Sequence, residues 1–177
     1  MFQRRRLRAV ERAALEAGIR WNFETFPQYL DAIEREGVGV NVAADSFFYA
    51  SYTGAEAGLV IVSADDPAMH SSQNEQDNRT FAKFGRVPCL EPSDSQEAKD
   101  MVIAAFGLSE RFDTPVLLRT TTRINHTRGA VTPGDLAPQT GPGRFVKSPF
   151  ELVMVPAVAR EAHARLVAKQ AKAQALA

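Results

Sequence analysis

Two short apolar runs constrain the fold of this chain more than any other sequence feature. They are Gly58–Ala64 and Pro115–Thr120. The first run is continuous rather than alternating, which predicts a strand buried on both faces. The second run predicts another apolar strand, and helical patterns separate the two along the chain. This order predicts an α/β fold with a mostly parallel sheet and helices on both faces.

The expected helices are marked by spacing and by their terminal residues. A helix over 43–53 stops at Gly54, and another covers about 74–84. A capping box of Ser93 with Gln96, or of Asp94 with Glu97, begins a third helix. That helix carries apolar residues at the i, i+3, i+4, i+7 spacing of a helix packed on a sheet: Ala98, Met101, Val102, Ala105, Leu108 and Phe112.

The remaining segments complete a three-part organisation. The N-terminal part, 1–37, contains expected helices over 4–17 and 31–36, and the core covers 38–130 with a short strand over 87–90. The last part, 131–177, begins with a Pro/Gly-rich loop over 132–143. It continues with a last strand over 152–155 and a helix that starts at Pro156 and frays over 168–177.

Composition excludes several classes of protein. Lys and Arg together number 21, as do Asp and Glu, so the net charge is zero and binding of nucleic acid through bulk charge is not expected. A hydrophobic content of 45% with 24% charged residues excludes disorder as the main state. A single cysteine, Cys89, provides neither an internal disulfide nor a cysteine-based metal site. Without an apolar run of ~20 residues or a secretory signal, we expect a cytoplasmic protein that does not span a membrane.

Two polar loops follow the predicted strands, where parallel sheets place their ligand sites. The first loop gathers hydrogen-bonding groups, and a histidine that titrates near neutrality, at the start of a helix. Its candidate cleft residues are His70, Ser71, Ser72, Gln73, Asn74 and Glu75. A capping box of Ser72 with Glu75 explains part of this polarity by helix initiation alone. It does not explain His70.

The second loop carries guanidinium groups that suit a carboxylate or a phosphate. Arg119 and Arg123 are the anion-holding candidates, and Arg128 lies beyond them. The alternative, which we favour, is a solvated basic strand exit that pairs with surface acids. The three histidines lack the close spacing of metal ligands, so no metal site is predicted. The sequence assigns no catalytic base.

Several motifs together resemble the alpha subunit of indolepyruvate ferredoxin oxidoreductase, a thiamine-diphosphate enzyme. The resemblance covers about residues 38–165, and its most specific part is the run from His70 to Asp77. The stretches that carry it are 41–45, 51–54, 58–67, 69–79, 88–100, 112–123 and 126–129, with weaker similarity in 145–147 and 155–160.

The resemblance implies a fold and a reaction. The core would be a truncated pyrimidine-binding domain that holds the aminopyrimidine end of thiamine diphosphate, shared with a partner domain. The family oxidatively decarboxylates aryl 2-oxoacids, transfers the acyl group to coenzyme A and passes electrons through iron–sulfur clusters to ferredoxin. The partners implied are the other subunits, in an oligomer, with neither nucleic acid nor membrane.

The sequence also departs from the family pattern. The segment that carries the activating glutamate has no clear counterpart, and the motif that binds magnesium and diphosphate is missing, as is the cysteine-rich ferredoxin module. Magnesium and iron–sulfur clusters would therefore belong to other chains. We expect one piece of a multi-chain oxidoreductase. The alternatives are a non-catalytic interaction domain or truncated relic of that subunit, and a free-standing ligand-binding module.

Overall fold

The structure is a computed structural model that describes residues 40, 43–55, 57–70, 72, 74–134 and 147–176. The helices expected over 4–17 and 31–36 lie outside these residues, as does the Pro/Gly-rich loop beyond 134. The division into 1–37, 38–130 and 131–177 stays a prediction.

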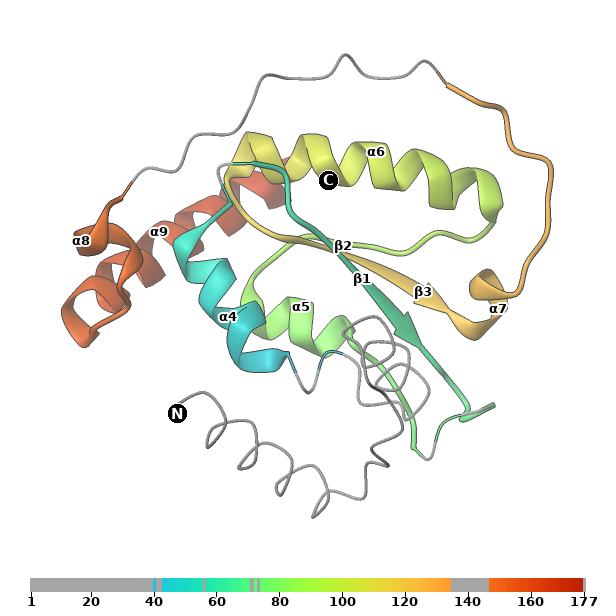
Figure 1. Cartoon of the computed structure of the whole chain (residues 1–177), viewed down its shortest axis with the longest axis horizontal. Helices are drawn as coiled ribbons and strands as arrows, with labels where there is room; N and C mark the ends of the chain where they lie inside the picture. The colour runs from blue at the N-terminus through green and yellow to red at the C-terminus, as the bar shows by residue number, and fades with distance from the viewer. Residues whose placement is uncertain are drawn as a thin grey trace, which may run out of the picture.

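The described part of the chain contains a three-stranded parallel sheet. Its strands are β1 (Val60–Asp65), β2 (Cys89–Leu90) and β3 (Val116–Thr121), in the order β1-β3-β2. Leu117 on the central strand pairs with Ile61 on one side and Cys89 on the other. Helix α6 (Ser95–Phe112) covers one face, and α4 (Ala44–Thr53) and α5 (Arg79–Gly85) lie on the other (Figure 1). The predicted α/β fold is confirmed.

Helix ends follow the capping residues that the sequence supplies. Helix α4 ends at Gly54, whose φ of 83° suits glycine, and a Cβ there would lie 2.5 Å from the Asp113 carboxylate. Asp94 caps α6 by accepting a 2.8 Å hydrogen bond from the Glu97 amide. The Glu97 carboxylate in turn accepts a hydrogen bond from the Ser93 amide. The predicted pairing of Asp94 with Glu97 is therefore confirmed as the cap.

The core lies on both faces of the central strand. Leu117 is fully buried and clusters with Phe47, Ala82 and Val87 on the side of α4 and α5. Helix α6 buries Ala105 and Phe112 from the predicted apolar stripe. Three further helices complete the described chain: α7 (Thr122–Asn125), α8 (Pro149–Leu152) and α9 (Pro156–Gln174). Helix α9 packs against α4, where the Tyr52 hydroxyl lies 2.9 Å from Nδ1 of His163.

Two expectations about the strands were wrong. Strand β1 is not buried on both faces, since Val62 is 63% exposed. The reason is that β1 is an edge strand of the described sheet and α6 packs more on β3 than on β1. The strand expected over 152–155 does not form, because α8 runs to Leu152 and α9 already begins at Pro156.

Two helix boundaries also differ from expectation. The helix expected from residue 74 starts at Arg79, because the side chains of Gln76 and Asn78 are buried and bonded before it begins. The C-terminal helix stays regular to Gln174 rather than fraying from 168. Contacts hold it there: Lys169 bonds to Asp113, and Arg86 donates to Gln170.

Candidate functional site

A polar cluster of four buried side chains and the exposed Glu91 occupies the carboxyl ends of the strands. Its members, named here the carboxyl-end cluster, are Ser63, Asp65, Asn78, Glu91 and Arg119. Side chains two residues apart share a face of a sheet, so Ser63 and Asp65 continue the row of Ile61, on the side that α5 covers. The cluster therefore lies directly beyond the apolar core of that face.

Asp65 is the centre of the carboxyl-end cluster. Its carboxylate accepts a 2.5 Å hydrogen bond from Nε of Arg119, which is also an ion pair. It further accepts bonds from the backbone amide and the Nδ2 of Asn78, at 2.7 and 2.6 Å. The hydroxyl of Ser63 donates to it at 3.1 Å. A fully buried carboxylate is thereby paired and hydrogen-bonded, as burial of a charge demands.

Arg119 joins β1, β2 and the rim of the site through its guanidinium. Besides Asp65, it donates to Glu91, which follows β2 and is partly exposed. Desolvation works to lower the pKa of Arg119, but the hydrogen bonds and charges of Asp65 and Glu91 outweigh it and raise that pKa. Arg119 is thus a fixed positive charge that is paired with one buried carboxylate, Asp65, and one exposed carboxylate, Glu91.

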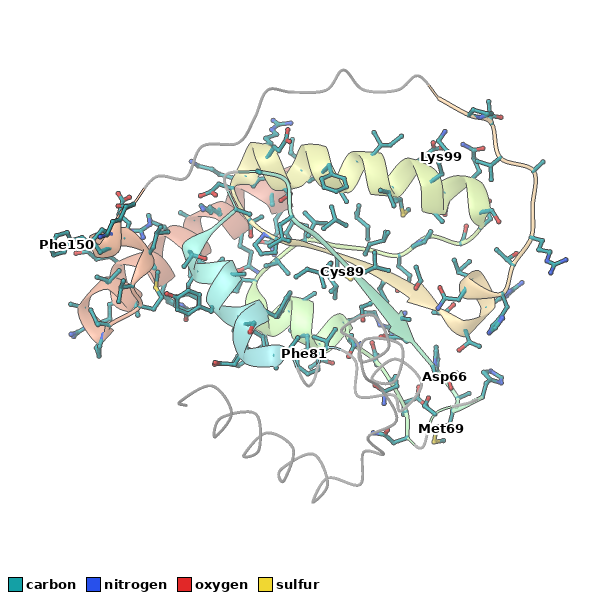
Figure 2. The ribbon with its side chains drawn as sticks, in the orientation of Figure 1. Asp66, Met69, Phe81, Cys89, Lys99 and Phe150 are labelled. Atoms are coloured by element: carbon teal, nitrogen blue, oxygen red, sulfur yellow. The ribbon has the colours of Figure 1, made fainter. Side chains whose placement is uncertain are left out.

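The loop between β1 and α5, here the 66–75 loop, is held by a second aspartate. Asp66 accepts hydrogen bonds from the amide and hydroxyl of Ser72, at 2.8 and 2.6 Å, and from the Thr122 hydroxyl at 2.6 Å. The start of the loop, at Asp66, is thereby tied to the start of α7. Figure 2 shows Asp66 and Met69 at this end of the molecule.

The 66–75 loop stores backbone strain. Ala68 and Met69 adopt left-handed conformations with φ of 63° and 55°, which cost non-glycine residues about 1–2 kcal/mol each. A 3.0 Å bond from the Ala68 amide to the Glu75 carboxylate helps to hold this turn. The predicted capping box of Ser72 with Glu75 is therefore wrong: Ser72 bonds to Asp66, Glu75 bonds to Ala68, and α5 begins further along.

An exposed ion pair stands at the edge of the cluster. Arg79 donates two hydrogen bonds to the Asp77 carboxylate, at 2.8 and 2.7 Å. The hydrogen bonds from the Arg79 side chain are the main cause that lowers the pKa of Asp77 from 3.8 to about 2, and burial opposes this shift. Asp77 also lies 3.8 Å from Nε of Arg119, which links the rim to the buried cluster.

The structure separates the residues that the sequence singled out. His70, Asn74 and Glu75 are exposed in the 66–75 loop and Ser72 is half-buried, whereas Ser71 and Gln73 lie outside the described residues. Arg119 is buried in ion pairs rather than in the solvated strand exit that the sequence favoured. Arg123 is exposed on α7, so the two arginines do not form one anion-binding fork.

Sequence reasoning missed the residues that organise this site. None of four organising residues was among the predicted site residues; they are Asp65, Asp66, Asn78 and Glu91. One signal could have found Asp65: in a strand, residues at even spacing share a face, so Ser63 and Asp65 follow Ile61 onto the core side. Glu91 and Asn78 become partners only through the tertiary fold.

The charge of this end of the molecule is acidic. The carboxylates gathered there outnumber the guanidinium groups; they are Asp65, Asp66, Glu75, Asp77 and Glu91, against Arg79, Arg119 and Arg123. Such a set of carboxylate acceptors favours groups that donate hydrogen bonds and disfavours a free phosphate. Within the described residues, no group of three His, Cys, Asp or Glu side chains is placed to hold a metal ion.

The fold and this candidate site define a parallel α/β domain with polar loops at the carboxyl ends of the strands. Comparison with curated proteins identifies the particular relatives. The chain is 53% identical over 132 residues to indolepyruvate oxidoreductase subunit IorA of Methanothermobacter thermautotrophicus, which is 75% of this chain and 21% of that subunit. It is 53% identical over 131 residues to IorA of Pyrococcus abyssi, which is 71% of this chain and 20% of that subunit. It is 47% identical over 137 residues to IorA of Archaeoglobus fulgidus, which is 76% of this chain and 22% of that subunit.

These matches confirm the predicted resemblance to the alpha subunit of indolepyruvate ferredoxin oxidoreductase. The similar segment belongs to an oxidoreductase subunit, and the chain spans about a fifth of the length of the curated relatives it matches. No protein-family model matches the chain, and no solved structure matches it significantly. Every helix in the described ranges is too short or too polar to cross a bilayer.

Proposed function

We propose that this chain supplies the pyrimidine-binding segment of an indolepyruvate-type 2-oxoacid:ferredoxin oxidoreductase, acting in the cytoplasm within a multi-chain complex. The observation that carries the proposal is the 53% identity, over three quarters of the chain, to subunit IorA. The enzyme would oxidatively decarboxylate aryl 2-oxoacids to acyl-coenzyme A and pass electrons to ferredoxin. Magnesium and the iron–sulfur clusters would be held by other chains.

The residues of the described site fit one end of thiamine diphosphate and not the other. An acidic loop region would repel a diphosphate, and its described residues hold no metal cluster to compensate. An aminopyrimidine instead donates hydrogen bonds, which suits carboxylates such as Glu75 and the asparagine Asn74. That mismatch supports the proposed division of the cofactor between this chain and a partner. When bound, the cofactor supplies the electron sink for decarboxylation.

The described residues would act by positioning. The Asp65–Arg119 pair fixes the ends of β1 and β3, and Asp66 fixes the start of the 66–75 loop. His70 and Glu75 are exposed on this framework, so a partner chain that docks on the loop could contact them. Side chains held on strained but well-bonded loops are common at functional sites.

Purification of the intact complex from the native host tests this function. Reduction of ferredoxin by indolepyruvate, with coenzyme A and thiamine diphosphate supplied, should depend on this chain. The double variant His70→Ala/Glu75→Gln should lose turnover by about tenfold or more, because each residue would contribute to cofactor or substrate positioning. Lys172→Ala, on the exposed side of α9 far along the chain, is the control that should keep full turnover.

A non-catalytic interaction domain, or a truncated relic of the subunit, is the second candidate. It is favoured by the segment that carries the family's activating glutamate, which has no clear counterpart in this sequence. In that case the double variant would turn over as fast as the unaltered complex. A free-standing ligand-binding module would instead bind a 2-oxoacid as the isolated chain, which calorimetry with indolepyruvate would detect.

A further inference from the structure

The two loops that leave the sheet at its carboxyl edge begin beside each other. Strands β1 and β3 pair in parallel, with Asp65 opposite Thr121. The chain then continues at Asp66 into the 66–75 loop and at Thr122 into α7. A contact between these two residues therefore joins the loop that carries the candidate cleft residues to a second element, which lies 56 positions away in the sequence.

The carboxylate of Asp66 makes this contact with both of its oxygens. Asp66 is 7% exposed. Its Oδ1 accepts a 2.6 Å hydrogen bond from the Thr122 hydroxyl, and its Oδ2 accepts bonds from the amide and hydroxyl of Ser72 at 2.8 and 2.6 Å. The Thr122 hydroxyl also lies 3.4 Å from the Asp65 carbonyl oxygen, but a hydroxyl has one proton to donate and the shorter contact uses it. These three side chains are named here the Thr122–Asp66–Ser72 bridge.

The bridge closes a strained turn. Between Asp66 and Ser72, the left-handed conformations of Ala68 and Met69 follow one another directly. Such conformations of non-glycine residues persist only where the surrounding contacts determine them. Without the bridge, the turn is free to relax toward negative φ, and His70, which follows Met69, would move with it. The bridge therefore sets which conformation of the loop is populated.

The Thr122 end of the bridge is the fixed end. Thr122 is half-buried and follows β3, of whose six residues five are buried. The pair of Asp65 and Arg119 holds the ends of β1 and β3 together directly before it. The Ser72 end belongs to the strained loop. Position is therefore transmitted from the sheet, through Thr122 and Asp66, to the loop.

We propose that Thr122 is a positioning residue that acts through Asp66 to hold the 66–75 loop in the conformation that binds the aminopyrimidine of thiamine diphosphate. This inference rests on the function proposed above, in which His70 and Glu75 position cofactor or substrate. Thr122 determines the fraction of chains whose loop is ready to bind. The apparent dissociation constant of a ligand rises in inverse proportion to that fraction.

Kinetics of the intact complex test this role. Thr122→Val removes the hydroxyl while keeping the shape of the side chain. The half-saturating concentration of thiamine diphosphate in ferredoxin reduction should rise about tenfold, as expected for the loss of one hydrogen bond to a charged group. The kcat at saturation should stay the same, because excess cofactor selects the competent loop. Thr122→Ser keeps the hydroxyl and should restore the half-saturating concentration.

A merely structural role would give the opposite pattern. Fewer folded chains would lower kcat per chain, whereas the chains that remain folded would bind the cofactor normally. Thr80→Val makes the same substitution at an exposed position on α5 and is the matched control, which should leave both parameters unchanged.

Hydrogen exchange of the full chain without cofactor gives a readout that does not depend on activity. The Ser72 amide donates to Asp66, so it should exchange about tenfold faster in Thr122→Val. The Asn78 amide donates to the neighbouring carboxylate of Asp65 and should keep its rate. Faster exchange at both amides would show a loss of the whole carboxyl end of the sheet rather than of the bridge.

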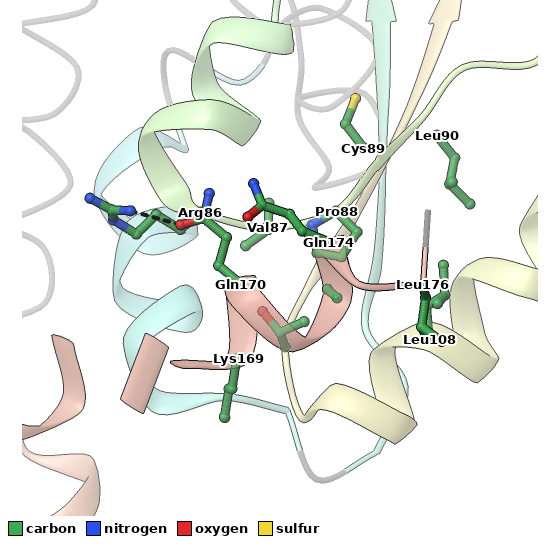
Figure 3. A pocket seen from close by; sticks show the side chains of 12 residues that line it. Arg86, Val87, Pro88, Cys89, Leu90, Leu108, Lys169, Gln170, Gln174 and Leu176 are labelled. Atoms are coloured by element: carbon green, nitrogen blue, oxygen red, sulfur yellow. Dashed lines mark hydrogen bonds between the residues drawn. The ribbon is translucent and has the colours of Figure 1, made fainter. Parts of the chain in front are cut away.

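Helix α9 provides the control for global stability. Its residue Gln170 accepts a bond from Arg86 beside a cavity of about 390 Å³, at the end of the molecule where the chain leads into β2 and β3 (Figure 3). The Gln170 amide should exchange at the same rate in Thr122→Val and in the unaltered chain.

Equal exchange of the Ser72 amide in Thr122→Val and in the unaltered chain would overturn the inference. So would an unchanged half-saturating concentration of thiamine diphosphate. Ferredoxin reduction that does not require this chain would instead overturn the proposed function and with it the role in cofactor binding, whereas the exchange data would still decide whether the bridge holds the loop. Should Thr122→Val fail to fold, Ser72→Ala breaks the bridge at its other end. The Ala68 amide, which donates to Glu75 within the loop, should then exchange faster, and an unchanged rate would overturn the inference.

Discussion

At the scale of single residues, Arg119 is the most consequential side chain in the described structure. It is 2% exposed and neutralises Asp65, whose side chain is fully buried. Forming such a pair costs desolvation energy that the mutual attraction only partly returns, whereas removing one member leaves the other as an uncompensated buried charge. The pair therefore fixes the ends of β1 and β3 against each other more strongly than a surface ion pair would.

The variant Arg119→Leu should be strongly destabilising. It leaves the Asp65 carboxylate buried with only the donors of Asn78 and Ser63, and such a loss typically costs about 3–5 kcal/mol. Urea unfolding followed by circular dichroism measures it. Arg123→Leu removes an exposed guanidinium from the next element and should change stability by less than about 0.5 kcal/mol. Equal effects of the two variants would contradict the buried pair.

Asp77 should make stability depend on pH in the acid range. Arg79 lowers its pKa in the folded chain to about 2. Its contribution to the free energy of unfolding is therefore present above 3.8, the pKa in the unfolded chain, and is lost as pH falls through the pKa of the folded chain. The loss should fall between roughly pH 4 and pH 2. Because the side chain is 38% exposed, solvent screening reduces the contribution to about 1 kcal/mol or less.

Titration of the Asp77 carboxyl by nuclear magnetic resonance checks this directly. The midpoint should lie near 2 in the unaltered chain, and Arg79→Gln should return it toward 3.8 because the main hydrogen-bond donor is gone. Asp77→Asn should flatten the corresponding part of the stability profile. A midpoint that Arg79→Gln leaves in place would show that another group lowers it.

At the scale of elements, the short helix α5 depends on the carboxyl-end cluster for its position. The residue before it, Asn78, donates its backbone amide to Asp65 and its side-chain amide to Asp65 and Ser63. Helix α5 is only seven residues long, which is too short to be stable without tertiary contacts. The sheet therefore anchors the start of this helix.

Asn78→Ala should loosen α5 more than the rest of the fold. It removes a donor to a buried carboxylate, which should cost about 1–3 kcal/mol. Hydrogen exchange should accelerate for the amides of α5 and change little for α6, which has its own cap at Asp94. Asn125→Ala, exposed at the end of α7, serves as the control. Uniform acceleration across both helices would instead indicate a global loss of stability.

The elements differ in how well the sequence predicted them, for physical reasons. Helix α6 has a cap and an apolar stripe within its own residues, and β3 is an apolar run, so local signals were sufficient. Strand β1 was expected to be buried on both faces because Val62 is apolar, but its exposure depends on which strands and helices lie beside it. The start of α5 was misplaced because Asn78 bonds across the fold rather than within the helix.

The candidate site was less predictable than the fold. The polar composition of the 66–75 loop predicted a candidate site there, and the structure places this loop directly after β1. The organising contacts, however, join Asp65 to Arg119 across 54 positions and Arg119 to Glu91 across 28 positions of sequence. No local pattern encodes such partners. The resemblance to the oxidoreductase subunit was predictable from the sequence because it rests on the order of residues alone.

At the scale of the whole molecule, the described sheet ends in an open edge. Strand β1 pairs with β3 on one side only, and Val62 on it is 63% exposed. An edge strand with an exposed apolar side chain is a template for pairing with another chain. We therefore expect that this edge associates.

The purified chain should therefore self-associate in a concentration-dependent way. Light scattering coupled to size exclusion should show a mass above 19.4 kDa that falls on dilution. Val62→Lys should shift the chain toward monomer, because a charge on an edge strand opposes pairing, and should leave the circular dichroism spectrum unchanged. Ala104→Lys adds the same charge on the exposed side of α6 and should not change the association. A monomer at all concentrations, or equal effects of the two lysines, would exclude β1 as the associating edge.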